Sequence, residues 1–258
     1  MTNAAPSSIY GPVGSWRLGR SLGVDLLCVD SICSFQCVYC QLGKINRVTD
    51  VREIFVPTAK VLEDLQNSDW QQADVITFSG SGEPTLAANL GEAIEKIKNL
   101  THKPVVVLTN STLLHRKQVR REISKADKIF CKLDAWSDDV LRRIDHPHAS
   151  ISLETIISGI RELRREFKGF LAIQTMILKT PTEPEIEKLA AILQTITPDE
   201  VQLNLPTRPV PHKYFFETRG NAVEFASDFL RIRTIPKNDL ENVRRKLSEL
   251  AKLPIITR

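Results

Sequence analysis

The feature that most constrains this chain is an alternation of short β-rich runs with amphipathic helical stretches. The β-rich runs occupy residues 23–28, 75–79, 105–110, 129–134, 170–177 and 201–205. Apolar residues at helical spacing fill stretches between them, at 58–67, 89–99, 116–125, 152–167 and 184–196. Strands that alternate with helices favour a parallel sheet with right-handed crossovers. We therefore predict an α/β fold, a partial (β/α)6 barrel of the TIM type, which is shorter than a complete eight-unit barrel.

The segment after the sixth strand departs from this pattern. Residues 206–237 contain four prolines in an irregular stretch, and Leu240, Val243 and Leu247 then follow at helical spacing. We expect a core domain over residues 1–210 and a C-terminal helical extension over 211–258. The pattern leaves open whether the extension is a substrate lid or a small helical appendage.

Three of the five cysteines, Cys33, Cys37 and Cys40, fall within eight residues. They follow the first predicted strand, so this cluster loop (residues 31–43) is expected at the strand's C-terminal end, where barrels of this type place their chemistry. A four-iron cluster needs four ligand positions, so three cysteines leave one iron open for a substrate or cofactor. Cys28 and Cys131 lie inside strand-like runs and are predicted to be buried core residues.

Structural zinc is the competing interpretation of these cysteines. Zinc sites of that kind usually have four closed protein ligands, and no second Cys or His pair follows at finger spacing. A non-catalytic iron–sulfur or zinc-binding protein, acting as a scaffold or electron carrier, therefore stays as the alternative from another functional class.

The compartment follows from what the sequence lacks. No apolar stretch approaches the ~18–20 residues needed to span a bilayer, and the first fourteen residues lack the basic start and apolar core of a secretion signal. We expect a cytoplasmic protein without a membrane partner, where thiols stay reduced and a cysteine cluster indicates metal or catalysis rather than disulfides. The net charge of +4 is too small to indicate a nucleic-acid partner and does not exclude one.

The spacing C-x3-C-x2-C, with an aromatic residue before the last cysteine, resembles the signature of the radical SAM superfamily. By that resemblance Cys33, Cys37 and Cys40 hold a [4Fe–4S] cluster, whose fourth iron binds the amino and carboxylate groups of S-adenosylmethionine (SAM), and Tyr39 lies near the adenine. The implied reaction reduces the sulfonium by one electron and gives a 5′-deoxyadenosyl radical that abstracts hydrogen from a substrate. An external electron donor of the flavodoxin or ferredoxin type is implied as a partner.

A loop of small residues follows the second predicted strand. Ser81, Gly82, Glu83 and Pro84 resemble the GGEP motif of the same superfamily, with serine at the first glycine position. In that family the backbone of the motif binds the SAM amino group, and small residues allow such a close approach. A tight strand-to-helix turn is the structural alternative.

Alternation along the fourth strand separates its two faces. Ile129, Cys131 and Leu133 form an apolar face, so Lys132 and Asp134 are expected on the opposite, inward face. The same logic places Gln202 and Asn204, together with Thr77, Ser79, Asn110 and Gln174, in a polar lumen near the strand ends. By resemblance, Asn110, Lys132 and Asp134 contact the SAM carboxylate or ribose, while a structural Lys132–Asp134 ion pair is the alternative.

Blocks at 10–25, 40–43, 79–86, 133–135 and 204–209 resemble a little-characterised subgroup, the wyosine-base-formation-like iron–sulfur oxidoreductases. Gly14 and Trp16 depart from it, since proline and arginine are usual there. Arg17, Arg20 and Arg208 are expected to gather near the barrel mouth, where they suit an anionic substrate or pair with the protein's own acids. The substrate is unidentified, a small anionic molecule or a tRNA. A tRNA-base-modifying enzyme is the alternative, although no RNA-binding module is visible.

Overall fold

The computed structural model describes residues 6–28, 30–220 and 228–257. Its main sheet has the strand order β1-β2-β5-β6-β7-β8-β9-β12, in which β1 (Ile9–Ser15) is antiparallel to β2 (Gly19–Val24) and the other pairings are parallel. The parallel strands after β2 are β5 (Val75–Phe78), β6 (Val105–Thr109), β7 (Lys128–Lys132), β8 (Phe170–Met176), β9 (Glu200–Asn204) and β12 (Ile255–Thr257). The mostly parallel α/β architecture of a partial TIM-type barrel is confirmed.

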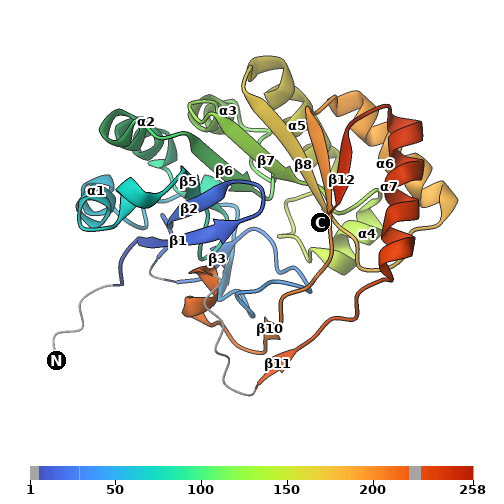
Figure 1. Cartoon of the computed structure of the whole chain (residues 1–258), viewed down its shortest axis with the longest axis horizontal. Coiled ribbons are helices and arrows are strands. Elements are labelled where there is room, and N and C mark those ends of the chain that lie inside the picture. Colours follow the sequence, from blue (N-terminus) through green and yellow to red (C-terminus); the bar gives the residue numbers. More distant parts are fainter. Residues whose placement is uncertain (1–5, 29, 221–227, 258) are drawn as a thin grey trace.

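Helices cover the outside of this curved sheet, as Figure 1 shows. They are α1 (Thr58–Gln66), α2 (Leu90–Thr101), α3 (Lys117–Ile123), α5 (Leu153–Glu166), α6 (Glu183–Ile196) and α7 (Lys237–Ala251), while the short α4 (Asp138–Ile144) follows β7. None of the helices in the described ranges combines the length and apolar character needed to cross a membrane.

Capping and apolar spacing explain why these helices form where they do. The Ser152 hydroxyl accepts a bond from the Thr155 N–H at the start of α5, and Thr182 and Glu185 form a capping box at the start of α6. On α5, Ile156 and Ile160 then recur at helical spacing and are buried against the sheet.

The two faces of the strands separate as the alternation predicted. Ile129, Cys131 and Leu133 belong to the large core between the sheet and the helices, and Cys28 is buried in the same core. Toward the N-terminal ends of the strands the lumen is apolar and is filled by a second core of Val75, Val106, Phe130 and Ala172. Lys132 follows Phe130 on the same face, so the lumen becomes polar toward the C-terminal ends of the strands.

Several elements of the core domain differ from the prediction. The first parallel strand is Gly19–Val24 rather than 23–28. Near its start, Arg20 and Ser21 are polar and do not form a β-rich run, whereas the apolar Leu26–Cys28 form a buried turn instead of a strand. The antiparallel β1 and the short α4 were not expected.

The C-terminal extension contains the expected helix, α7, but also an unexpected strand. β12 pairs in parallel with β9, with Ile255 opposite Val201, and so adds a seventh parallel strand to the six that were predicted. Three residues are too short a run for a periodicity argument to detect.

Short elements lie outside the main sheet. β3 (Ile32–Cys33) pairs with β4 (Arg47–Val48), and β10 (Val210–Pro211) pairs with β11 (Phe229–Leu230). Single 3-10 turns lie at η1 (Trp70–Gln72), η2 (Pro84–Leu86) and η3 (Phe216–Gly220).

Candidate active site

The cluster loop is fixed on one side by the loop that follows β5. The Ile32 N–H donates to the Ser81 carbonyl at 3.0 Å, and the Glu83 N–H donates to the Ile32 carbonyl at 3.1 Å. A Cβ added to Gly82 would lie 1.7 Å from the Ile32 carbonyl oxygen, so the two backbones approach too closely for any side chain there. The small-residue loop of the sequence therefore positions the cysteine segment.

The other side of the cluster loop is fixed by the segment after α4. The Gln36 N–H donates to the Asp145 carbonyl at 2.9 Å, and the Val38 N–H donates to the Ile144 carbonyl at 2.9 Å. The His148 N–H reaches the Ser34 carbonyl, also at 2.9 Å. Backbone bonds on both sides thus hold the three cysteines at the C-terminal ends of the strands.

Two polar side chains donate to the cysteine sulfurs. Lys132 Nζ lies 2.9 Å from Cys37 Sγ, and Asn110 Nδ2 lies 3.5 Å from Cys33 Sγ and 2.8 Å from Ser34 Oγ. Burial raises the pKa of the Cys33 thiol to about 12, and the nearby Glu83 and Cys40 add to that rise. Burial also raises the pKa of Cys37 and Cys40. These thiols need a cationic centre to be held as thiolates.

The donor set fits an iron–sulfur cluster. Within the described residues, no three His, Cys, Asp or Glu side chains are gathered around one point as for a single metal ion. The thiolates of a four-iron cluster bind different irons, so they need not converge on one point. Hydrogen bonds from Lys132 and Asn110 to the sulfurs are the kind of outer contact that orients cluster ligands.

Lys132 is the centre of a buried charge network. Its ammonium lies 3.0 Å from Asp134 Oδ2 and 2.7 Å from Asp145 Oδ1, and 4.6 Å from the ring centre of Tyr39. The Tyr39 hydroxyl donates to Asp134, which also accepts the Met176 N–H at 2.8 Å. Burial raises the pKa of Asp134, although the neighbouring Lys132 opposes that rise. The structural ion pair considered from the sequence is therefore present, together with a second acid.

Glu83 is buried and connects the ends of two neighbouring strands. Its carboxylate accepts bonds from the Thr85 N–H and hydroxyl, from the Thr109 hydroxyl at 2.7 Å and from the Asn110 N–H at 2.6 Å. Burial raises its pKa despite these donors. The Glu83 side chain thus supports the loop from within.

The irregular segment after β9 crosses the cluster loop. The Phe215 N–H donates to the Leu42 carbonyl at 3.0 Å, and Gln41 Nε2 donates to the Thr218 carbonyl at 3.2 Å. Arg208 donates to the side chain of Gln41. This segment therefore lies against the same loop that carries Cys40.

The same segment also reaches the loop after β5. The Tyr214 hydroxyl lies 3.2 Å from Ser81 Oγ, and Arg219 Nη1 lies 3.1 Å from the buried carboxylate of Asp25. Asp25 in turn accepts bonds from the N–H and hydroxyl of Ser81, at 3.1 and 2.6 Å. Ser81 is thereby anchored from two directions.

The three cysteines and the residues predicted to bind the cofactor, Tyr39, Ser81, Gly82, Glu83, Asn110, Lys132 and Asp134, lie on adjoining loops and strand ends. Several residues of the site were missed, namely Asp25, Asp145, Tyr214 and Arg219. Asp25 directly follows β2, so correct placement of that strand would have placed it among the strand-end residues. Asp145 ends a helix that was not predicted, and no sequence signal marks the two tail residues.

The three arginines expected at the mouth are separated. Arg20 lies at the N-terminal end of β2, so its placement near the mouth was wrong; its guanidinium lies 3.8 Å from Asp74, in line with the alternative that it pairs with one of the protein's own acids. Arg17 Nη1 reaches Gln202 Oε1 at 3.1 Å and Asn204 Oδ1 at 3.3 Å. Hence Arg17, but not Arg20, extends toward the polar strand ends.

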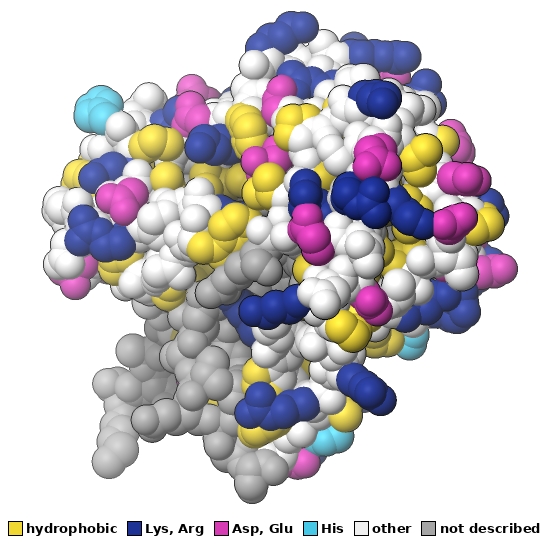
Figure 2. All heavy atoms as spheres, turned by 45° about the vertical axis from the view of Figure 1, so that its right-hand side comes forward, with side chains coloured by type: hydrophobic (Ala, Val, Ile, Leu, Met, Phe, Trp, Pro, Cys, Tyr) yellow, Lys and Arg dark blue, Asp and Glu magenta, His cyan; other side chains and the backbone are white. Residues whose placement is uncertain are grey.

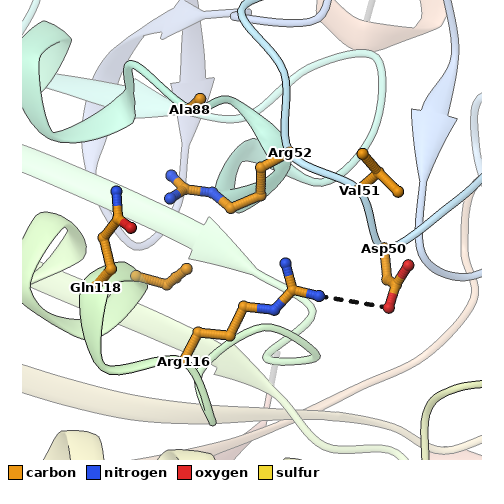
Figure 3. A pocket seen from close by; sticks show the side chains of 7 residues that line it. Asp50, Val51, Arg52, Ala88, Arg116 and Gln118 are labelled. Atoms are coloured by element: carbon orange, nitrogen blue, oxygen red, sulfur yellow. Dashed lines mark hydrogen bonds and ion pairs between the residues drawn. The ribbon is translucent and has the colours of Figure 1, made fainter.

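Two of the cavities in the described part of the chain bear on this region. One has a volume of about 460 Å³ and is lined by Asp50, Val51, Arg52, Ala88, Arg116, Gln118 and Val119. Figure 3 shows the contact between Arg116 and Asp50 in its wall, where the two charged groups are 3.4 Å apart. The Arg52 guanidinium donates hydrogen bonds to the carbonyls of Thr85 and Ala87, both at 2.8 Å, so it is already engaged by the protein itself. The other, of about 330 Å³, includes Cys37 in its wall.

Comparisons with known proteins agree with this geometry. Residues 29–193 match the radical SAM superfamily. A UPF0026 protein of Synechocystis is 47% identical over 257 residues, which are 98% of this chain and 97% of that relative.

Two solved structures are similar in fold. A radical SAM methyltransferase from Sphaerobacter thermophilus has a TM-score of 0.61 at 16% identity, covering 92% of this chain and 65% of its own. SuiB of Streptococcus suis bound to S-adenosylmethionine has a TM-score of 0.58 at 12% identity, covering 89% of this chain and 45% of its own.

Proposed function

This chain belongs to the radical SAM superfamily, and we propose that Cys33, Cys37 and Cys40 bind a [4Fe–4S] cluster that acts on S-adenosylmethionine. The observation that carries the proposal is the doubly clamped cysteine loop, with Lys132 2.9 Å from Cys37 Sγ. When bound, the cluster supplies the electron that cleaves SAM to methionine and a 5′-deoxyadenosyl radical, which takes hydrogen from the substrate.

The chain's own residues orient the site in this proposal. Asn110 and Lys132 donate to the sulfurs, and Asp134 and Asp145 hold the Lys132 ammonium in place. Glu83 ties the loop after β5 to the end of β6, which fixes the backbone of Ser81 and Gly82. A rigid, hydrogen-bonded frame of this kind keeps reacting groups at fixed distances.

We place SAM against the same frame. Its amino group is assigned to the backbone of Ser81, Gly82 and Glu83, and its adenine to the neighbourhood of Tyr39. Asn110, Lys132 and Asp134 would hold its carboxylate and ribose. Lys132 already contacts Cys37 and two acids, so its ammonium would have to give up one of these partners in order to bind SAM.

Anaerobic reconstitution tests the proposal. About four irons per chain are expected for one cluster, and dithionite with SAM should release 5′-deoxyadenosine. Cys37→Ser should lose both, whereas the matched Cys131→Ser, in the buried core, should keep them. A fully loaded protein that never cleaves SAM would refute the catalytic role, and zinc alone would support a structural one.

The substrate can be sought with the same material. Turnover with deuterated cell-extract fractions should transfer label into 5′-deoxyadenosine when the fraction contains the substrate. Fractions of small anionic molecules and of tRNA separate the two classes suggested by the sequence. Label from neither class would exclude both.

A further inference from the structure

The cavity beside Cys37 opens a path from the surface to the proposed cluster. It lies between the cluster loop and the short β10–β11 ribbon, and its walls include Cys37, Gly43, Lys44, Val210, His212 and Leu230. Because Cys37 lines this wall, a molecule there lies beside a proposed ligand of the cluster.

The ribbon is set directly on the cluster loop. A Cβ added to Gly43 would lie 2.3 Å from the Lys213 carbonyl oxygen and 2.7 Å from that of Pro211. Since backbone meets backbone here, no layer of side chains separates the ribbon from the loop. A partner that binds to the outer side of this backbone is therefore separated from Gly43 by a single strand.

The surface of the ribbon is basic and carries an exposed leucine. Arg208, Lys213, Arg231 and Arg233 are exposed in the described segments 207–213 and 228–233, against one acid, Asp228, which lies 3.6 Å from His212. Leu230 is 52% exposed between them. In Figure 2 dark-blue side chains and yellow ones gather low on the molecule, where Figure 1 places β10 and β11.

We propose that this ribbon face, made of Lys44, Lys213, Leu230, Arg231 and Arg233, docks an acidic one-electron donor protein that reduces the cluster at Cys37. The inference rests on the proposed function. The donor, a reduced flavodoxin- or ferredoxin-type protein, loses one electron and the cluster gains it, and no bond or proton is transferred.

Charge and apolar surface together favour a protein as the occupant. Complementary charge accelerates association and sets its orientation, and an exposed leucine next to charged side chains suits a protein interface. A nucleic acid would use the same arginines but gains nothing from Leu230 or from the opening at Cys37. Binding of tRNA is accordingly the rival outcome of the test.

Stopped-flow reduction of the reconstituted holoenzyme by an acidic ferredoxin is the experiment. Arg231→Glu with Arg233→Glu should slow reduction at least tenfold at low salt and flatten its salt dependence, because steering by charge weakens with ionic strength. Arg121→Glu with Lys188→Glu makes the same change in net charge at exposed positions on α3 and α6 and should leave the rate unchanged.

A small reductant separates docking from chemistry. Photoreduced deazaflavin needs no docking face, so it should reduce the wild type and both double variants at equal rates. Equal ferredoxin rates in wild type and the Arg231/Arg233 variant would overturn the inference, and a simultaneous loss of tRNA binding would assign the face to RNA. A wild-type cluster that deazaflavin cannot reduce would instead count against the proposed function.

Discussion

Lys132 connects the charge network to Cys37, a proposed cluster ligand, through a single ammonium. It bonds to Cys37 Sγ, to Asp134 and to Asp145, so the two acids hold the donor against the sulfur. A donor to a ligating sulfur stabilises the more negative, reduced cluster and raises its reduction potential. In the proposed site the Lys132 side chain therefore has a role that does not depend on contact with SAM.

Replacing Lys132 should lower the reduction potential of the cluster. Lys132→Met alone leaves two buried acids unpaired, which typically costs about 3–5 kcal/mol. The double variant Lys132→Met with Asp145→Asn removes one charge of each sign and keeps the local net charge. We expect at least a tenfold fall in the reduced-to-oxidised ratio at fixed potential, which is about 59 mV for one electron.

The measurement is a redox titration of the cluster in the absence of SAM, monitored by electron paramagnetic resonance. Lys132→Arg keeps a donor and a positive charge and should restore most of the potential. An unchanged potential in the double variant would show that the Lys132–Cys37 bond does not tune the cluster.

Gly82 offers a second test at the residue scale. In Gly82→Ala the new methyl group would meet the Ile32 carbonyl at 1.7 Å, so the cluster loop must move away. We expect a folded protein that retains less than half the iron of the wild type after reconstitution. Gly14→Ala is the matched control, since nothing lies within 4 Å of a Cβ there. Equal iron content in both variants would contradict the clamp.

At the scale of elements, the junction of β1 with α1 depends on one carboxylate. Asp64 Oδ2 accepts the N–H and hydroxyl of Ser8, at 2.9 and 2.7 Å, and Lys60 Nζ lies 2.5 Å from Oδ1. Burial alone would raise the pKa of Asp64, but the bonds from Lys60 and Ser8 hold it below its ordinary value of 3.8. The ionised form is thus favoured by folding.

This junction should make stability depend on pH. A folded pKa below the unfolded one gives stabilisation that is complete above the unfolded value and is lost as the pH falls through the folded one. Because Lys60 is 41% exposed, water screens the pair and the effect should be about 1 kcal/mol.

Urea unfolding of wild type and Asp64→Asn between about pH 6 and pH 3 measures it. The difference in unfolding free energy should shrink as the pH falls. Glu63→Gln, on the exposed side of the same helix, should show no such trend. A difference that stays constant with pH would assign the effect to the hydrogen bonds rather than to the charge.

The sequence predicted elements well where a repeated pattern exists. Lys132 and Asp134 were assigned to the inward face because Ile129, Cys131 and Leu133 alternate with them on one strand. Asp145 had no such signal, since it belongs to a turn that reaches the site only through tertiary bonds to the cluster loop. Contacts made by loops distant in sequence leave no period for a pattern to detect.

At the scale of the whole molecule, the tail is built into the barrel rather than attached to it. α7 packs its buried Leu240, Val243 and Leu247 inward, and β12 then extends the main sheet beside β9. Gln194 on α6 also donates to the Leu250 carbonyl at 2.8 Å. The first strand and the last thus belong to one continuous sheet.

A main sheet that includes β12 and a large core that includes Leu247 imply that barrel and tail unfold as one cooperative unit, and Leu247 tests this. Leu247 is fully buried and Leu250 is 43% exposed on the same helix, so Leu247→Ala should cost about 2–5 kcal/mol and Leu250→Ala at most about 0.5 kcal/mol. All three tryptophans, Trp16, Trp70 and Trp136, precede residue 211, so their fluorescence reports on the barrel alone. If the tail is part of the same unit, Leu247→Ala must shift the fluorescence transition in urea by the full amount and coincide with the transition in circular dichroism. A fluorescence transition that ignores Leu247→Ala would instead make residues 211–258 a separate domain, since a distant tail that unfolds by itself leaves the tryptophans in place.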